Sequence, residues 1–389
     1  MSHFKIAYVN ENKNFNIKKI LNKKFAEQHF AIGLYYLIKE LKTKYEVAWS
    51  DDAIIKIENG EWDPKKVLVI QEMESSKGSK LIKLGAIPLI WMCFEGPFIG
   101  HWIYEKINIY GNKFYKIIID DNNYPNINFD KTKILSLGYP CVEKVSFIRK
   151  FSKYSQKDWT SKKLIVGIWS NKHYAIHLKK IYYHLSNFNF RYIFSEIISK
   201  ILSKTYKKNL MFQLIDKRID VFLNLSKYCD FYLYGRGWNK VSETPNKLLN
   251  KMMKFKKNIF DGDNSKYREL SKKNIFKNFR FCLCFENSSS KNYISEKLYD
   301  CFKEKIIPIY LGASNIEDII PKNCFIDYRD FKTDHDLYNF INGLDYEKAN
   351  NYLKFAHNFL LSINFQRNTC EYYVKNIMHQ IKLFENNYK

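Results

Sequence analysis

The sequence predicts an α/β protein made of two Rossmann-like domains. Short apolar runs alternate with helical or polar segments along most of the chain, which has 389 residues, 46% of them hydrophobic. Alternation of this kind is typical of buried parallel strands connected by helices. Since one hydrophobic core rarely serves more than roughly 250–300 residues, a chain of this length is expected to form two.

The first domain is predicted at residues 1–150. Residues 4–9 are strand-like, and residues 25–41 have the apolar spacing of a helix. Further buried-strand candidates follow at 67–70, 87–92, 115–119 and 134–137. We expect an N-terminal Rossmann-like domain over these residues.

The second domain is predicted at residues 164–345, after a polar linker at 151–163. Its strand candidates include 164–169, 231–234, 279–285 and 306–311, and a basic insertion occupies about 172–210. Residues 346–389 are expected to form C-terminal helices. The sequence leaves open whether the last segment, 372–384, packs on the first domain or lies on the surface.

One βαβ unit between residues 279 and 312 is the most informative segment. Apolar residues alternate from Phe279 to Phe285, and a polar Glu-Asn-Ser cluster follows. Ser295 is placed to cap a helix over 296–305, which leads into a second buried strand. Ligands of open α/β sheets bind at the carboxyl ends of the strands. The following residues are therefore expected to border one nucleotide-sized crevice: Glu286, Asn287, Tyr293, Glu296 and Lys297.

Residues 285–288, followed by Tyr293-Ile-Ser-Glu-Lys297 and a strand ending at Gly312, resemble the donor-binding signature of the α-1,3/1,4-fucosyltransferases, glycosyltransferase family 10. Most members have threonine where this chain has Ser295, which keeps the hydroxyl. Residues 324–331 are similar to the family's continuation. The resemblance implies GT-B architecture, in which two Rossmann-like domains face each other across a cleft, and GDP-fucose as the donor substrate.

The segment Trp91-Met-Cys-Phe-Glu-Gly-Pro97 resembles the family block that contains the proposed catalytic base, which is Glu95 in this chain. A carboxylate just past a buried strand projects from the carboxyl edge of the sheet, and apolar neighbours can raise its pKa. The resemblance implies that the N-terminal domain binds the acceptor, and the acceptor-binding residues are predicted to be Trp91, Phe94 and Phe98. The chain departs from the family pattern at 96, 98 and 99, and a helix cap or surface carboxylate is the alternative for Glu95.

Further donor contacts are implied by weaker blocks of the same resemblance. Asn171 follows a strand that resembles the one near the donor diphosphate, and Arg218 resembles an arginine that contacts the donor phosphates. The planar fork of arginine holds two phosphate oxygens, although a solvated surface arginine is the alternative. Gly235 and Gly237 permit close backbone approach or positive φ. The donor site is thus expected to contain Asn171, Arg218, Gly235, Glu286, Asn287, Tyr293, Ser295, Glu296 and Lys297.

No obligatory metal or other cofactor is expected. Asp261-Gly-Asp263 looks like a metal-binding DxD motif, but it lies in a Lys- and Asn-rich loop and the family does not rely on such chemistry. The leaving GDP would then be stabilised by the cations of Lys297 and Arg218. The resemblance implies one inverting displacement, in which Glu95 removes the acceptor proton.

The chain is strongly basic, with 64 Lys and Arg against 40 Asp and Glu and a formal charge of +24. This charge attracts polyanions, but no nucleic-acid-binding motif is recognisable and no nucleic acid partner is expected. Lysines at 200, 204, 207 and 208 oppose apolar residues within the basic insertion. Residues 179–208 are therefore predicted to contact an anionic membrane surface, with an ordinary packed helix as the alternative.

Cysteine usage and hydropathy favour a cytoplasmic protein, which the basic insertion would place at the inner face of the membrane as a peripheral protein. The eight cysteines form no CxxC pairs, which suits a reducing compartment and argues against structural zinc. No apolar stretch approaches the ~20 residues needed to span a bilayer, and the sequence opens on a strand-like run instead of a signal peptide.

Three functions therefore stay in view. The first is an inverting fucosyltransferase that moves fucose from GDP-fucose to a glycan hydroxyl, in surface polysaccharide or lipopolysaccharide synthesis and with a lipid-linked acceptor. The second is the same fold acting on another GDP-sugar. The third is a non-catalytic basic protein that binds nucleic acid or membrane. The sequence does not specify the acceptor, the linkage or the oligomeric state.

Overall fold

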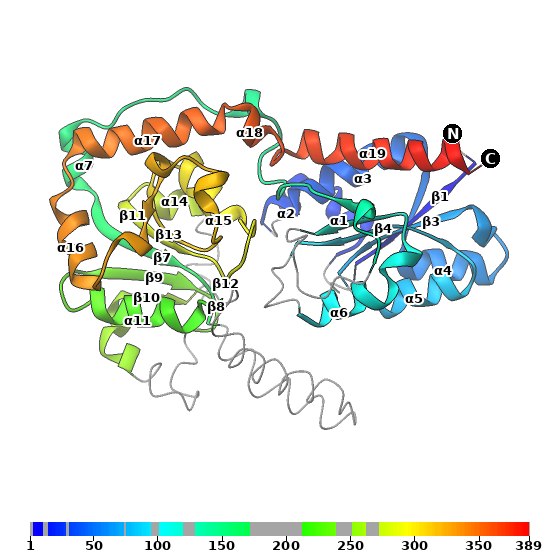
Figure 1. The fold of residues 1–389 in the computed structure, drawn as a ribbon, viewed down its shortest axis with the longest axis horizontal. Helices are drawn as coiled ribbons and strands as arrows, with labels where there is room; N and C mark the ends of the chain where they lie inside the picture. Colours follow the sequence, from blue (N-terminus) through cyan, green and yellow to red (C-terminus); the bar gives the residue numbers. More distant parts are fainter. Residues whose placement is uncertain are drawn as a thin grey trace. The chain divides into compact units, whose positions relative to one another are not determined.

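The computed structural model describes residues 3–10, 15–28, 31–73, 75–94, 101–119, 129–171, 212–238, 251–261 and 272–388. The chain divides into unit 1, Met1–Ile148 with Ser362–Lys389, and unit 2, Arg149–Leu361 (Figure 1). Each unit contains a six-stranded parallel sheet among its described residues, with helices against it. The predicted α/β class with two Rossmann-like domains is confirmed.

The sheet of unit 1 has the order β2-β1-β3-β4-β5-β6. Its strands are β1 (Lys5–Val9), β2 (Glu46–Trp49), β3 (Val67–Glu72), β4 (Ile87–Cys93), β5 (Lys116–Ile119) and β6 (Ile134–Leu135). Alternate residues of β1 serve opposite faces. Ile6 and Tyr8 pack with α3 (Ile32–Lys44) and α19 (Cys370–Asn387), whereas Ala7 and Val9 pack with α4 (Ser50–Glu58) and α5 (Ser76–Lys83). Three further helices are α1 (Ile17–Ile20), α2 (Lys23–Gln28) and α6 (His101–Tyr110).

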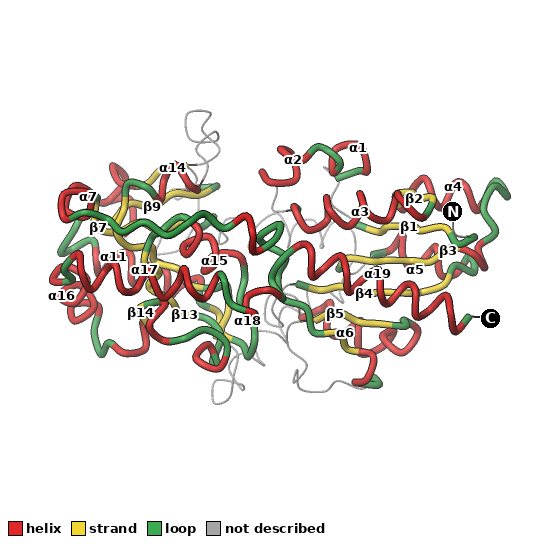
Figure 2. The backbone as a smooth tube through the Cα atoms, turned by 90° about the horizontal axis from the view of Figure 1, so that it is seen from above, coloured by secondary structure: helices red, strands yellow, loops and turns green. Residues whose placement is uncertain are grey.

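The C-terminal helix α19 completes the core of unit 1. It lies beside α3 in both views (Figures 1 and 2). Ile377 and Ile381 are fully buried in the cluster that also contains Ile6 and Tyr8. The open question about segment 372–384 is thus answered, because this segment packs on the first sheet.

The sheet of unit 2 has the order β10-β9-β7-β11-β13-β14. Its strands are β7 (Lys163–Ile168), β9 (Phe231–Gly235), β10 (Ile259–Asp261), β11 (Phe279–Phe285), β13 (Ile307–Leu311) and β14 (Ile326–Asp327). The helices are α7 (Gln156–Ser161), α11 (Ile215–Leu225), α14 (Lys272–Phe276), α15 (Glu296–Lys303), α16 (Asp334–Gly343) and α17 (Tyr346–Leu360). A short antiparallel pair joins β8 (Phe212–Gln213) to β12 (Ser288–Ser289). The predicted strand–helix–strand unit is present as β11, α15 and β13.

Two predicted boundaries need correction. Residues 151–163 are not a linker, because α7 lies within them and Trp159, 3% exposed, packs in the core of unit 2 against Phe281. The core position of Trp159 was not predicted, because its neighbours in the sequence are polar. The C-terminal helices are divided, since α17 belongs to unit 2 while α18 (Ile363–Gln366) and α19 belong to unit 1.

Two other predictions concern membranes. The basic insertion at about 172–210 lies outside the described residues. Within the described parts of the chain, every helix is too short or too polar to cross a bilayer.

Candidate active site

The candidate site lies at the carboxyl edge of the unit 2 sheet. In sequence order, the strands of this sheet follow the arrangement 3-2-1-4-5-6, so the direction of the connections reverses between β7 and β11. Ligands of doubly wound sheets bind at this switch point. β11 ends here at Phe285, and the backbone N–H of Glu286 donates to Leu311 O at 2.8 Å.

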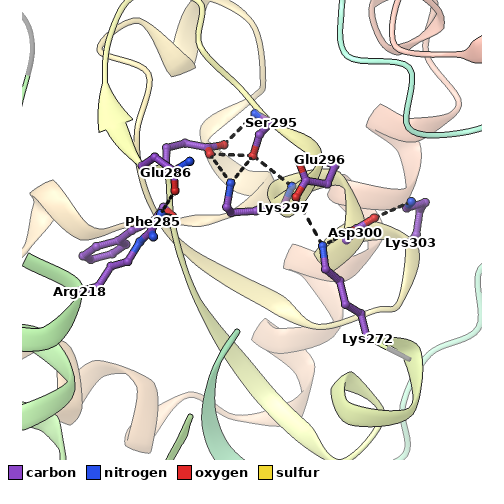
Figure 3. Close-up of polar contacts among 10 residues, drawn as sticks. Arg218, Lys272, Phe285, Glu286, Ser295, Glu296, Lys297, Asp300 and Lys303 are labelled. Carbon is purple, nitrogen blue, oxygen red and sulfur yellow. Dashed lines mark hydrogen bonds and ion pairs between the residues drawn. The ribbon is translucent and has the colours of Figure 1, made fainter. Parts of the chain in front are cut away.

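Glu286 is the centre of a buried polar cluster (Figure 3). Its side chain is fully buried. Its Oε1 accepts a hydrogen bond from Ser295 N at 2.8 Å, and its Oε2 accepts from Ser295 Oγ at 2.7 Å and from Lys297 Nζ at 3.1 Å. The spacing between Glu286 and the Ser295-Glu-Lys297 block thus has a physical reason. The carboxylate of Glu286, at the end of β11, accepts hydrogen bonds from Ser295 and Lys297 at the start of α15.

Ser295 also begins helix α15. Its Oγ caps the helix by accepting from Lys297 N at 3.4 Å, and it accepts from Lys297 Nζ at 2.8 Å. Burial opposes the charge of Lys297, but the carboxylates of Glu286 and Glu296 raise its pKa, so the ammonium group stays protonated. Ser295 and Glu286 therefore hold a cation in a fixed position at the strand end.

A second ionic group lies beside this cluster (Figure 3). Lys272 Nζ is 2.6 Å from Asp300 Oδ2 and 3.6 Å from Glu296 Oε1, and Lys303 Nζ is 2.7 Å from Asp300 Oδ1. Burial acts to raise the pKa of Glu296, but Lys297 and Lys272 outweigh it and the pKa is lowered. Lys272 was missed by sequence reasoning because it lies in one of many lysine-rich stretches and no motif marks it.

Arg218 lies in the first turn of α11 and is 1% exposed. Its Nη2 donates to Phe285 O at 2.5 Å and to Asn287 Oδ1 at 3.1 Å. Burial lowers its pKa to about 10, against the opposing effect of Glu286 and Tyr293, so the guanidinium remains charged at neutral pH. The structure thus brings together five residues of the predicted donor site: Arg218, Glu286, Asn287, Ser295 and Lys297. The charges of Arg218 and of Glu296, a sixth predicted residue, influence the pKa of Lys297.

Three buried polar atoms of this region have no hydrogen-bond partner among the described residues. They are Arg218 Nε, Ser288 Oγ and Ser290 Oγ. A buried polar atom without a partner costs about 1–3 kcal/mol, so such atoms are uncommon unless a ligand or water satisfies them. Ser288 belongs to the 285–288 block of the predicted donor signature but was not predicted as a site residue, and Ser290 was missed because a Ser-Ser-Ser run gives it no individual signature.

Asn171 and the glycine turn after β9 fix the neighbouring strand ends. Asn171 N donates to Arg236 O at 2.8 Å, and its Nδ2 donates to Gly237 O at 3.1 Å. A Cβ on Gly235 would lie 1.8 Å from Trp169 O, and Gly237 has a φ of +79°. Close approach and positive φ, the two properties that the sequence predicts for these glycines, are both present.

A small pocket opens between the ends of β7 and β11. It is lined by Ile168, Trp169, Lys272, Phe276, Cys282, Leu283, Cys284, Phe285 and Lys297, and its volume is about 20 Å³. Among the described residues that line it, Lys272 and Lys297 are charged, and both form ion pairs with carboxylates. A volume of this size holds about one water molecule, so the pocket is much smaller than the predicted nucleotide-sized crevice.

The structure describes only some of the site residues predicted in unit 1. Trp91 is 2% exposed, donates from Nε1 to Met73 O at 2.6 Å and packs against Phe114, which leaves no surface for a glycan and corrects its predicted acceptor role. Phe94 is half-buried and contacts Tyr139 and Tyr373. Glu95 and Phe98 lie outside the described residues, as does Asp263 of the DxD sequence. No group of three or more potential metal ligands occurs in the described ranges.

Comparison with known proteins identifies the region around this site. Residues 196–375 match the model of "Glycosyltransferase family 10 (fucosyltransferase) C-term". Over 68 residues, 17% of the chain, it is 41% identical to mouse 4-galactosyl-N-acetylglucosaminide 3-alpha-L-fucosyltransferase 9. Over 83 residues, 21% of the chain, it is 35% identical to Helicobacter pylori alpha-(1,3)-fucosyltransferase FucT. The matched segments span 19% and 16% of these relatives.

Solved structures share the fold of the whole chain. A glycosyltransferase from Rickettsia africae has a TM-score of 0.52 at 11% identity, with 98% of this chain and 99% of that chain covered. Anabaena HepE in complex with UDP-glucose has a TM-score of 0.53 at 10% identity, with 98% and 100% covered. These likenesses show the fold alone, which is the GT-B type. The match over residues 196–375, which include Arg218, Glu286 and Lys297, confirms that this part of the chain resembles the C-terminal region of glycosyltransferase family 10.

Proposed function

We propose that this protein is a glycosyltransferase that moves fucose from GDP-fucose to a hydroxyl group of a glycan. The observation that carries the proposal is the pair of cations at the switch point of unit 2, the buried Arg218 and the half-buried Lys297, within the region that matches family 10. The matched relatives are named as fucosyltransferases that act on a 4-galactosyl-N-acetylglucosaminide or form an alpha-(1,3) linkage.

The chemistry of the cluster suits a departing nucleoside diphosphate. When the bond between the sugar carbon and the phosphate oxygen breaks, negative charge develops on GDP, and fixed cations in a site of low dielectric stabilise that charge. Lys297 is fixed by Glu286 and Ser295, and Arg218 has an Nε without a partner among the described residues. These residues stabilise the leaving group without needing to move.

Glu286 serves the reaction indirectly. Both of its carboxylate oxygens are occupied by Ser295 and Lys297, and the side chain is fully buried. It is therefore assigned to positioning Lys297 and not to proton transfer. The proton of the acceptor hydroxyl is proposed to pass to Glu95, in a single displacement that inverts the sugar carbon, as the family resemblance implies.

The biological setting is also a proposal. We propose a role in surface polysaccharide or lipopolysaccharide synthesis, a lipid-linked acceptor, and a cytoplasmic or peripheral location. The formal charge of +24 supports the peripheral location alone, because it favours anionic surfaces. The alternatives are another GDP-sugar as donor, and a non-catalytic protein that binds nucleic acid or membrane.

Calorimetric titration of the full chain with GDP, combined with a product assay, tests the proposal. The assay supplies GDP-fucose or another GDP-sugar with free and lipid-linked glycans, including a 4-galactosyl-N-acetylglucosaminide. Fucose transfer, and GDP affinity lowered at least about tenfold in Lys297→Ala, are expected. Lys348→Ala, on the exposed side of α17, is the matched control. Binding only to RNA or anionic vesicles would favour the non-catalytic alternative, and selective use of another GDP-sugar would replace the donor.

A further inference from the structure

Unit 1 has a switch point of its own, and a polar cluster occupies it. β2 and β3 lie on opposite sides of β1, so the direction of the connections reverses between β1 and β3. By the same rule that locates the site in unit 2, a ligand is expected at the carboxyl ends of these two strands. The residues found there are Tyr8, Asn10 and Glu72.

These three side chains form one hydrogen-bonded network. Tyr8 OH donates to Glu72 Oε1 at 2.5 Å, and Asn10 Nδ2 donates to Glu72 Oε2. Tyr8 is fully buried, whereas Asn10 and Glu72 are half-buried and keep part of their surface accessible. Tyr373 of α19 adjoins the network and donates to Met92 Sδ at 3.2 Å. The network is therefore rigid on its inner side and reachable on its outer side.

The backbone turns sharply immediately after Glu72. Met73 has a φ of +58°, a conformation that side chains other than glycine rarely adopt. Three hydrogen bonds hold it: Met73 N donates to Met92 O at 2.8 Å, and Met73 O accepts from Trp91 Nε1 at 2.6 Å and Gln71 Nε2 at 3.0 Å. Backbone strain that the surroundings enforce in this way is concentrated at functional sites. Its effect here is to end β3 directly after the carboxylate.

The carboxylate is also unfavourable for the fold at neutral pH. Burial raises the pKa of Glu72, although the hydrogen bonds from Tyr8 and Asn10 act in the opposite direction. Among the described residues, no lysine or arginine forms an ion pair with Glu72. A glutamine would fill the same space without this disadvantage, and side chains kept at the expense of stability are candidates for function.

We propose that Glu72, which accepts hydrogen bonds from Tyr8 and Asn10, also binds hydroxyl groups of the glycan acceptor, a role that rests on the proposed function. A carboxylate accepts hydrogen bonds from hydroxyls. A negatively charged group that has no cationic partner among the described residues disfavours the diphosphate of the donor. The network therefore selects a neutral, hydroxyl-rich saccharide and is a specificity determinant on the acceptor side.

The test uses the full chain and the variant Glu72→Gln, with Glu58→Gln on the exposed surface of α4 as the matched control. With GDP-fucose and a 4-galactosyl-N-acetylglucosaminide, we expect the KM for the acceptor to rise at least about tenfold in Glu72→Gln, while GDP affinity is unchanged and the unfolding temperature does not fall. Unchanged KM overturns the proposal. A joint loss of GDP affinity, acceptor affinity and thermal stability also overturns it, because that result indicates a structural role.

A donor-free measurement separates this proposal from the proposed function. Saturation-transfer NMR with the same disaccharide reports acceptor binding directly, and weaker signals in Glu72→Gln than in Glu58→Gln are expected. Equal signals from both variants, or no disaccharide signal from the wild-type chain, overturn the acceptor role. Failure of the wild-type chain to bind GDP overturns the donor assignment, while the NMR comparison still decides the role of Glu72.

Discussion

At the scale of single residues, the buried carboxylate Glu286 determines whether the unit 2 site is intact. Its negative charge offsets the cost of desolvating the ammonium group of Lys297, whose Nζ lies 3.1 Å from Glu286 Oε2. The net gain from a buried ion pair is small, but removal of one partner leaves an uncompensated charge. The two members of the pair are therefore expected to be strongly coupled.

We predict that Glu286→Gln lowers the free energy of unfolding by roughly 3 kcal/mol, because Lys297 keeps its charge and loses its nearest counter-charge. The double variant Glu286→Gln/Lys297→Met should recover part of this loss. Urea denaturation of the wild-type chain, both single variants and the double variant measures the coupling. Additive losses would contradict the buried-charge explanation.

Glu72 provides a pH-dependent prediction at the same scale. Burial raises its folded-state pKa above the ordinary value of 4.5. At pH values between 4.5 and the raised pKa of the folded state, Glu72 keeps a proton in the folded protein that it has released in the unfolded chain. The free energy of unfolding therefore falls as pH rises through this range. Glu72→Gln cannot ionise and escapes this fall. Urea denaturation at a series of pH values from about 4 upward should show the variant gaining stability relative to wild type; a constant difference would refute the effect.

At the scale of secondary structure elements, the sequence predicts the unit β11-α15-β13 well. Alternating apolar residues and a serine N-cap are local signals, and the structure has the strand, the cap and the helix where they indicate. The roles of Trp159 and Trp91 are harder to predict from sequence, because a tryptophan can either pack in a hydrophobic core or line a binding site. Both side chains are buried in the structure. Three other residues could not be recognised from a local sequence pattern, because their contacts are with residues distant in sequence: Lys272, Ser288 and Met73.

The glycine turn after β9 yields the prediction at this scale. Gly235→Ala should lower the free energy of unfolding by roughly 3 kcal/mol or more, because its Cβ would lie 1.8 Å from the backbone oxygen of Trp169, which cannot rotate away. Gly343→Ala is the control, since no atom lies within 4 Å of that Cβ at the end of α16. Thermal unfolding should show little change or a small gain for this variant. Equal losses in both would remove the steric explanation.

At the scale of the whole molecule, unit 1 is assembled from both ends of the chain. Residues before 149 supply its sheet, and residues after 361 supply α19. The predicted domain boundaries treat the C-terminal helices as one group because helical periodicity does not indicate which core a helix covers. Only packing distinguishes α17 from α19.

Substitution in α19 should therefore weaken unit 1 selectively. Ile377 is fully buried, and Ile377→Ala is expected to lower the free energy of unfolding by about 2–4 kcal/mol. Ile363→Ala, at a position that is 78% exposed, is the control and should have almost no effect. Hydrogen exchange should become faster in β1 and β3 and stay unchanged in β11 and β13. Faster exchange in β11 alone would contradict the assignment of α19 to unit 1.

The division of unit 1 between the two ends of the chain also sets an order of folding during synthesis. Unit 2 is continuous in sequence and has all of its residues once Leu361 has left the ribosome, whereas unit 1 lacks α19 until Cys370–Asn387 have also been made. Domains fold as units once their chain is present. We therefore expect unit 2, the half of the nascent protein that contains the candidate active site, to fold first. The first strands of unit 1, including β1 with Tyr8, would reach their final packing last, because they pack against Tyr373 of α19.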